Sequence, residues 1–190
     1  MVERLSALAG HDHTGKSGCL DEQGNAAVCL QNIQGLVLYQ VAAWPDSCRM
    51  VSELIAETAG CPQEPEPHQA ATGSHAVAMR IEPLKWWLYG VTAPIIDVEQ
   101  GVTLDLSHSR THIRVSGSAA ATLLNRHLPL DLREAAFPVG SVASSVMHHV
   151  GVTLWHSDKG YELLMPRGFA LSLWQGLLAS AEQFGVEVVA

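Results

Sequence analysis

Residues 105–117 read DLSHSRTHIRVSG, and this stretch carries the clearest strand pattern in the chain. Polar and apolar residues alternate from Thr111 to Val115, which places Ile113 and Val115 on the same side of a pleat. A second alternating run covers residues 102–106. Between the two runs, Asp and Ser side chains are suited to satisfying turn backbone groups. We interpret the segment as two strands joined by a polar turn.

The flanking sequence predicts further strands and a few helices. Apolar residues Val51, Leu54, Ile55 and Ala59 share one helix face after Pro45, and Gly60 ends that helix. Further helices are expected at 118–127 and 169–184. Strands are expected at 28–30, 36–41, 76–81, 85–89, 142–148, 150–156 and 161–165. This order predicts an α+β fold with a mixed, mainly antiparallel sheet. We expect one domain over residues 28–190, made of two similar halves at about 28–100 and 101–185.

Residues 1–27 mix Gly, His, Asp, Ser and Gln without strand or helix periodicity, which predicts a flexible N-terminal arm. Within it, residues 10–17 (GHDHTGKS) match the pattern of a phosphate-binding loop. Such a loop works only between a buried strand and a helix, and the surrounding residues predict neither. We interpret the match as chance, and a nucleotide-binding module remains the weakest alternative function.

Composition and charge narrow the function classes. The 190 residues carry a net charge of −8, which disfavours binding to a phosphate backbone. No apolar run approaches the ~18 residues that a membrane span needs, and the first residues lack a signal-peptide pattern, so we expect a cytoplasmic protein. Four cysteines at irregular spacing indicate idle thiols rather than a zinc or redox motif.

The chain offers no convincing catalytic, cofactor-binding or metal-ligating set. His148 and His149 are expected to point to opposite faces of a strand, and residues 105–110 bring Asp, Ser and His together in sequence rather than in space. Candidate subunit-interface residues are Trp86, Trp87 and Arg110. One of two adjacent Trp rings on a strand is expected to face outward. The guanidinium group of Arg110 can form a pair of hydrogen bonds with a carboxylate.

The second half of the sequence resembles the gamma subunits of heterotetrameric sarcosine oxidase over about residues 102–185. The first half, with Gln34-Gly35, the helix after Pro45 and the KWWL run at 85–88, resembles them more loosely. The matching segments are residues 105–117, LPLDL at 128–132, AFPVGS at 136–141, His149-Val150, Leu154-Trp155 and YELLMPR at 161–167. The same stretch is similar to the first domain of the glycine-cleavage T-protein, which implies a folate-binding-domain-like fold.

The resemblance implies a complex of alpha, beta, gamma and delta subunits that oxidises the N-methyl group of sarcosine. It implies FAD, FMN and NAD in the large subunits, zinc in delta and tetrahydrofolate in alpha. The gamma subunit would then be a non-catalytic assembly subunit without its own cofactor. Two alternatives stay open: a subunit of a related N-methylglutamate or dimethylglycine dehydrogenase, and a free-standing tetrahydrofolate-binding domain, although no folate-gripping acidic site is recognisable.

Overall fold

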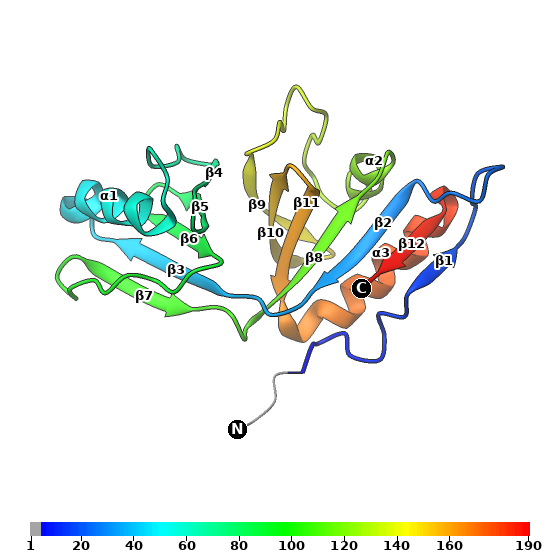
Figure 1. Ribbon diagram of the computed structural model, residues 1–190, viewed down its shortest axis with the longest axis horizontal. Helices are drawn as coiled ribbons and strands as arrows, with labels where there is room; N and C mark the ends of the chain where they lie inside the picture. The colour runs from blue at the N-terminus through cyan, green and yellow to red at the C-terminus, as the bar shows by residue number, and fades with distance from the viewer. Residues whose placement is uncertain (1–4) are drawn as a thin grey trace. The chain divides into compact units, whose positions relative to one another are not determined.

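The structure, a computed structural model, describes residues 5–190 and has the predicted α+β class (Figure 1). Its contacts divide the chain into two compact units. Unit 1 holds the described residues up to Gln34 together with Ser109–Val139 and Ser144–Ala190, and unit 2 holds Gly35–His108 and Gly140–Ala143. The division falls at Gly35 and His108, whereas the expected halves met between residues 100 and 101.

The strands and helices have the following bounds. The strands are β1 (Gly15–Ser17), β2 (Val28–Ile33), β3 (Leu38–Ala43), β4 (Ala70–Thr72), β5 (Val77–Glu82), β6 (Lys85–Tyr89), β7 (Gly101–Asp105), β8 (Arg110–Ser116), β9 (Val142–Met147), β10 (Val150–Ser157), β11 (Gly160–Pro166) and β12 (Val186–Val189). The α-helices are α1 (Cys48–Ala59), α2 (Ala120–Leu124) and α3 (Ala170–Ala181), and short 3-10 turns cover Pro45–Ser47, Arg167–Phe169 and Glu182–Phe184. None of the helices within residues 5–190 is long and apolar enough to cross a membrane.

Unit 1 is built on a seven-stranded sheet in the order β1-β12-β2-β8-β11-β10-β9 (Figure 1). The predicted strand β8 lies at its centre, antiparallel to β2 and β11, whereas β12 runs parallel to β2. In this register Leu30 lies opposite Val115 and Leu163 lies opposite Ile113, and all four side chains are fully buried. The alternation read from the sequence therefore sets the apolar face of this sheet.

Unit 2 contains a five-stranded sheet in the order β4-β5-β6-β3-β7, with α1 packed against one face. Val51, Ile55 and Ala59 of α1 form a buried cluster with Val41 of β3 and Trp86 of β6. The helix ends where expected, because Gly60 takes a left-handed conformation at φ 70° and its N–H bonds to the carbonyl groups of Ala56 and Glu57.

Three short elements differ from the sequence-based expectation. The strands β4 and β12 are missing from the prediction, because segments of three and four residues carry too little periodicity and form through pairing with β5 and β2. The helix expected at 118–127 is confined to Ala120–Leu124. Beyond it, the Asn125 side chain accepts a hydrogen bond from the Leu132 N–H, so the chain turns instead of continuing the helix.

The expectation that residues 1–27 form no strand is wrong for the described part of this segment. Gly15–Ser17 forms β1, which pairs antiparallel with β12. Leu8 is completely buried, and the Asn32 amide donates hydrogen bonds to Ser6 and to the Asp12 carboxylate. The first four residues of the predicted arm lie outside the described residues. The packing arises from partners distant in sequence, which local periodicity does not report.

The packing of this segment predicts unequal effects of two glycine substitutions. Gly10 and Gly18 both have φ +78°, but a Cβ at Gly18 would lie 2.2 Å from the Glu182 carbonyl oxygen, while a Cβ at Gly10 meets nothing within 4 Å. Gly10→Ala is expected to cost about 1 kcal/mol through backbone strain alone, and Gly18→Ala about 1–3 kcal/mol more through overpacking. Urea unfolding of both variants measures the difference. Equal losses would contradict the packing described here.

Candidate functional site

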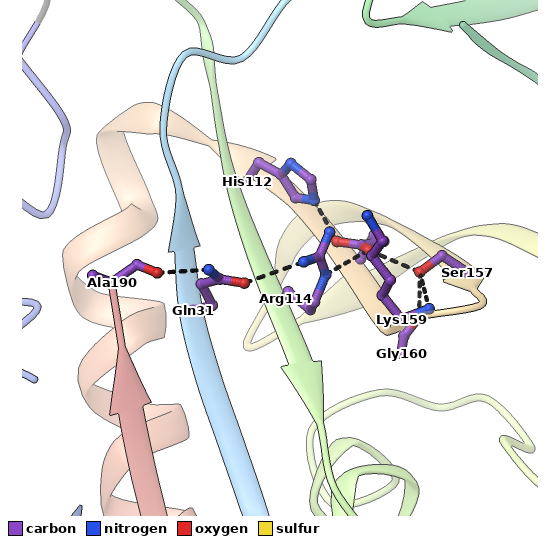
Figure 2. Close-up of polar contacts among 8 residues, drawn as sticks. Gln31, His112, Arg114, Ser157, Lys159, Gly160 and Ala190 are labelled. Atoms are coloured by element: carbon purple, nitrogen blue, oxygen red, sulfur yellow. Dashed lines mark hydrogen bonds and ion pairs between the residues drawn. The ribbon is translucent and has the colours of Figure 1, made fainter. Parts of the chain in front are cut away.

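The most concentrated group of polar side chains lies on the sheet of unit 1, on the face opposite its apolar side (Figure 2). Arg114 of β8 lies between Gln31 of β2 and Glu162 of β11 in the strand register. Cross-strand neighbours share a face, so these three side chains form a row across the sheet. His112 precedes Arg114 by two residues and shares this face, because strand side chains alternate.

Glu162 is the centre of this polar network. Its Oε2 lies 2.6 Å from His112 Nε2, and its Oε1 accepts hydrogen bonds from Arg114 Nε at 2.8 Å and Ser157 Oγ at 2.8 Å (Figure 2). Both Glu162 and His112 are only 1% exposed. The carboxylate therefore has donors on both oxygens and almost no access to solvent.

The network continues outward on both sides of Glu162. Arg114 Nη1 donates to Gln31 Oε1 at 3.1 Å, and the Gln31 amide donates to the Ala190 carbonyl oxygen at 2.6 Å (Figure 2). On the other side, Ser157 Oγ lies 3.1 Å from the Gly160 carbonyl oxygen and accepts from the Lys159 N–H, which closes the turn between β10 and β11. The polar contacts thus connect β2, β8, β10 and β11.

The electrostatics indicate that Glu162 is a structural anion. Burial alone would raise the pKa of Glu162, but the hydrogen bond and charge of His112, followed by the hydrogen bonds from Arg114 and Ser157, outweigh burial and lower that pKa. Because both Glu162 oxygens are engaged inside the sheet, the network ties together β8, β10 and β11.

Sequence reasoning missed this network. The available signal was the placement of His112 and Arg114 at alternate positions of a strand whose neighbouring residues Ile113 and Val115 are apolar, since charged side chains are rarely buried without a partner. Their partner Glu162 is 50 residues from His112 along the chain, so the pairing emerges only from the strand register.

The two tryptophans singled out by the sequence are both buried. Trp86 is 0% exposed and Trp87 is 4% exposed, so the expectation that one ring faces outward is wrong. Trp86 packs in the cluster against α1, with the Arg80 guanidinium 5.0 Å from its ring centroid. Trp87 lies on the opposite face of β6 and its Nε1 donates to Gln40 Oε1 at 3.2 Å. The α1 cluster covers the Trp86 face of β6, and on the other face Trp87 is flanked by its cross-strand neighbours Gln40 of β3 and Met79 of β5.

Arg110 begins β8 opposite Pro166 and is half-buried, so burial lowers the pKa of its guanidinium. It stands two positions before His112, at the end of the turn that precedes β8. In that turn the Asp105 carboxylate accepts the Ser107 N–H at 2.8 Å, and Ser107 Oγ accepts the Leu38 N–H at 3.0 Å. The turn role predicted for Asp105 is confirmed, whereas the Ser107 side chain bonds to the backbone of Leu38, 69 residues away.

The stretch that matches a phosphate-binding loop has a different structure. Gly15–Ser17 is a strand rather than a loop before a helix, and Lys16 Nζ donates to the Gly24 carbonyl oxygen at 3.0 Å. The next α-helix in the chain is α1, which begins at Cys48. Without a helix N-terminus behind the loop, the backbone has no anion-binding end to offer, which agrees with a chance match.

The expectation that His148 and His149 point to opposite faces of a strand is wrong. Both residues form the turn between β9 and β10. Both have positive φ, 48° at His148 and 70° at His149, as a two-residue hairpin turn of the I′ type requires. Within residues 5–190, no group of three or more His, Cys, Asp or Glu side chains is arranged to hold a metal ion.

His148 instead pairs with His127, which predicts a pH dependence. The two ring nitrogens, His127 Nδ1 and His148 Nε2, are 3.0 Å apart. Burial, then His148, then Arg126 lower the pKa of His127. Below about pH 6.5 the unfolded chain therefore binds more protons than the folded chain. The contribution of His127 to the free energy of unfolding is present above that pH and is lost as the pH drops toward the folded pKa.

His127→Gln should therefore flatten the dependence of the melting temperature on pH between about pH 5 and 7.5. The control is His13→Gln, at an exposed position, which should leave the slope unchanged. Equal slopes for the wild type and His127→Gln would show that this pair does not couple protonation to folding.

Comparison with known proteins agrees with the resemblance read from the sequence. The chain is 28% identical over 150 residues to the sarcosine oxidase gamma subunit of an Arthrobacter species, covering 75% of this chain and 74% of that protein. It is 31% identical over 93 residues to the gamma subunit of Corynebacterium sp. strain P-1, covering 48% of this chain and 46% of that one. The predicted resemblance to sarcosine oxidase gamma subunits is confirmed. No family model matches the sequence.

The fold comparison extends this likeness to nearly the whole chain. A chain of heterotetrameric sarcosine oxidase from Corynebacterium sp. U-96 superposes with a TM-score of 0.77 at 21% identity, covering 95% of this chain and 96% of that one. Aminomethyltransferase T of the glycine cleavage system from Bartonella henselae gives a TM-score of 0.61 at 14% identity, covering 95% of this chain and 56% of that one. The predicted T-protein-like α+β fold is confirmed.

Proposed function

We propose that this chain is the gamma subunit of a sarcosine-oxidase-type complex, in which partner subunits oxidise an N-methyl amino acid. The observation that carries the proposal is the agreement between sequence and fold. The homologues are sarcosine oxidase gamma subunits, and the fold matches a chain of heterotetrameric sarcosine oxidase over 95% of this chain. The partners would be alpha, beta and delta subunits.

The described side chains support a non-catalytic role within that complex. The polar group around Glu162 is centred on a buried carboxylate, both oxygens of which are engaged in contacts within the chain. FAD, FMN, NAD, zinc and tetrahydrofolate would then belong to the partner subunits, as the family resemblance implies. The resemblance also implies a place in cytoplasmic N-methyl amino acid catabolism and one-carbon metabolism.

Two alternative functions make different predictions for the same preparation. A related complex would act on N-methylglutamate or dimethylglycine, with a similar subunit in this position. A free-standing domain would bind tetrahydrofolate by itself, an idea favoured by the likeness to aminomethyltransferase T.

Affinity purification of the tagged chain from its own cells, followed by mass spectrometry of the eluate, separates these functions. The proposal predicts three further chains in fixed ratio, with the flavin absorbance of the assembled complex. Turnover of N-methylglutamate or dimethylglycine instead of sarcosine would select the related dehydrogenase. A chain that elutes alone with stoichiometric tetrahydrofolate would overturn the proposal.

A further inference from the structure

Unit 2 presents a group of exposed apolar side chains around β7. Ile95 is 99% exposed, Val98 73% and Leu104 54%, which are large values for aliphatic side chains. The group, named here the β7 strip, consists of Trp44, Ile95, Val98, Val102 and Leu104. Contiguous exposed apolar surface of this kind marks sites of association more often than isolated residues do.

The local contacts place Trp44, Val98, Val102 and Leu104 in one region, and Ile95 stands three residues before Val98 in the chain. Val102 and Leu104 alternate on β7 opposite Ala42 and Gln40 of β3, which places both on the sheet face that points away from the α1 cluster. Trp44 follows β3 directly, and its Nε1 donates to the Val98 carbonyl oxygen at 2.9 Å. The indole therefore fixes the loop that carries Val98 beside the end of β7.

The backbone of β7 is also open to a partner. In the five-stranded sheet β7 pairs with β3 and forms the edge (Figure 1). The Leu106 N–H donates to the Leu38 carbonyl oxygen, and in an antiparallel pair every second residue directs its N–H and C=O groups toward the partner strand. Residues 102 and 104 therefore hydrogen-bond to β3. The N–H and C=O groups of Thr103 and Asp105 consequently point away from the sheet. An edge of this kind accepts an added strand through main-chain hydrogen bonds.

Carboxylates outnumber cations around the β7 strip. Asp46, Asp97, Glu99 and Asp105 are exposed, and none of these carboxylates takes part in an ion pair with another residue of the described chain. Residues 91–107 contain no Lys, Arg or His. Of the cations nearby, His108 acts electrostatically on Asp105, and Lys85, opposite Ala42 in the register, already pairs with Glu82. The charge beside the apolar surface is therefore predominantly negative.

We propose that the β7 strip binds an extended segment of another subunit of the complex, in which apolar side chains alternate with Lys or Arg. The segment adds a strand to β7, packs its apolar side chains on Val102 and Leu104, and pairs its cations with the flanking carboxylates. The same charges disfavour a second copy of this chain, because two acidic strips would face each other. The inference rests on the proposed function, which supplies the partner subunits.

The test uses Thr103→Pro, which removes an N–H that points away from β3 and blocks strand addition without breaking a bond of the existing sheet. Thr103→Val keeps that N–H and is the matched control. In the reconstituted complex, Thr103→Pro is expected to weaken retention of this chain at least ~10-fold, a change on the scale of losing a central interface contact, while Thr103→Val retains wild-type binding.

A second pair of variants keeps the proposal testable if Thr103→Pro does not fold. Asp97→Lys combined with Glu99→Lys should weaken binding and reduce its sensitivity to salt, because the steering charges are reversed. The control is Val139→Asp combined with Val146→Asp, two exposed apolar positions of unit 1 that are not part of the β7 strip, which should leave binding unchanged.

The outcomes distinguish the two proposals. A wild-type chain that joins the complex, with all β7 variants retained equally, would overturn the β7 inference and leave the proposed function standing. A wild-type chain that never joins the complex would overturn both. If the wild-type chain forms a dimer and Thr103→Pro abolishes that dimer, the β7 strip binds a second copy of this chain. That result would overturn the inference.

Discussion

Glu162→Ala is expected to lower the free energy of unfolding by about 3–5 kcal/mol, the usual cost of removing one partner from a buried ion pair. The substitution leaves Arg114 without its carboxylate and takes away the group that His112 and Ser157 contact. Glu162→Gln keeps the shape and one acceptor, so a smaller loss is expected. Urea denaturation followed by circular dichroism measures both values.

The control for this prediction is Asp131→Ala, which breaks an exposed ion pair with Arg133 and is expected to change stability little. The pH dependence supplies a second readout. Because the pKa of Glu162 is lowered, its stabilising effect is present above its unfolded pKa of about 4.3 and is lost as the pH falls through the folded value. A Glu162→Ala protein as stable as the wild type would contradict the structural role of the network.

Trp86→Ala is expected to cost about 3–5 kcal/mol, as for other buried aromatic residues truncated to alanine. Trp86 is fully buried in the cluster formed with Val41 and with Val51 and Ile55 of α1, so truncation leaves a cavity in the core of unit 2. Thermal and urea unfolding of the isolated chain measure the loss.

Trp44→Ala is the matched control for this second prediction. Trp44 is 44% exposed, so its truncation should affect stability much less and should instead weaken assembly through the β7 strip. A Trp86→Ala protein with wild-type stability but impaired assembly would restore the interface role first considered for Trp86.

The longer elements of the fold could be predicted because their periodicity is local. The alternation in β8 and the helix face of α1, with Gly60 at its end, is legible without any tertiary information. The strands β1 and β12 were missed because each is too short to carry a pattern, and their pairing brings residue 15 beside residue 188. Both strands are stabilised by pairing with segments that lie far away in the sequence, and local periodicity does not reveal such pairing.

The site was harder to predict for the same physical reason. Glu162, Arg114 and Gln31 come from three separate strands, so only the register shows that they meet. The burial of Trp87 likewise depends on neighbours from two other strands, Gln40 of β3 and Met79 of β5, which only the register places beside it. In contrast, the turn role of Asp105 was predictable, since its carboxylate bonds to a backbone N–H only two residues away.

The central claim is that this chain supports chemistry carried out by its partners. The most direct measurement compares the isolated chain with the reconstituted complex, recording flavin absorbance and the rate of sarcosine oxidation in each. The account predicts no flavin and no turnover in the isolated chain, and both in the complex that contains it. An isolated chain that binds flavin and oxidises an N-methyl amino acid unaided would contradict the account.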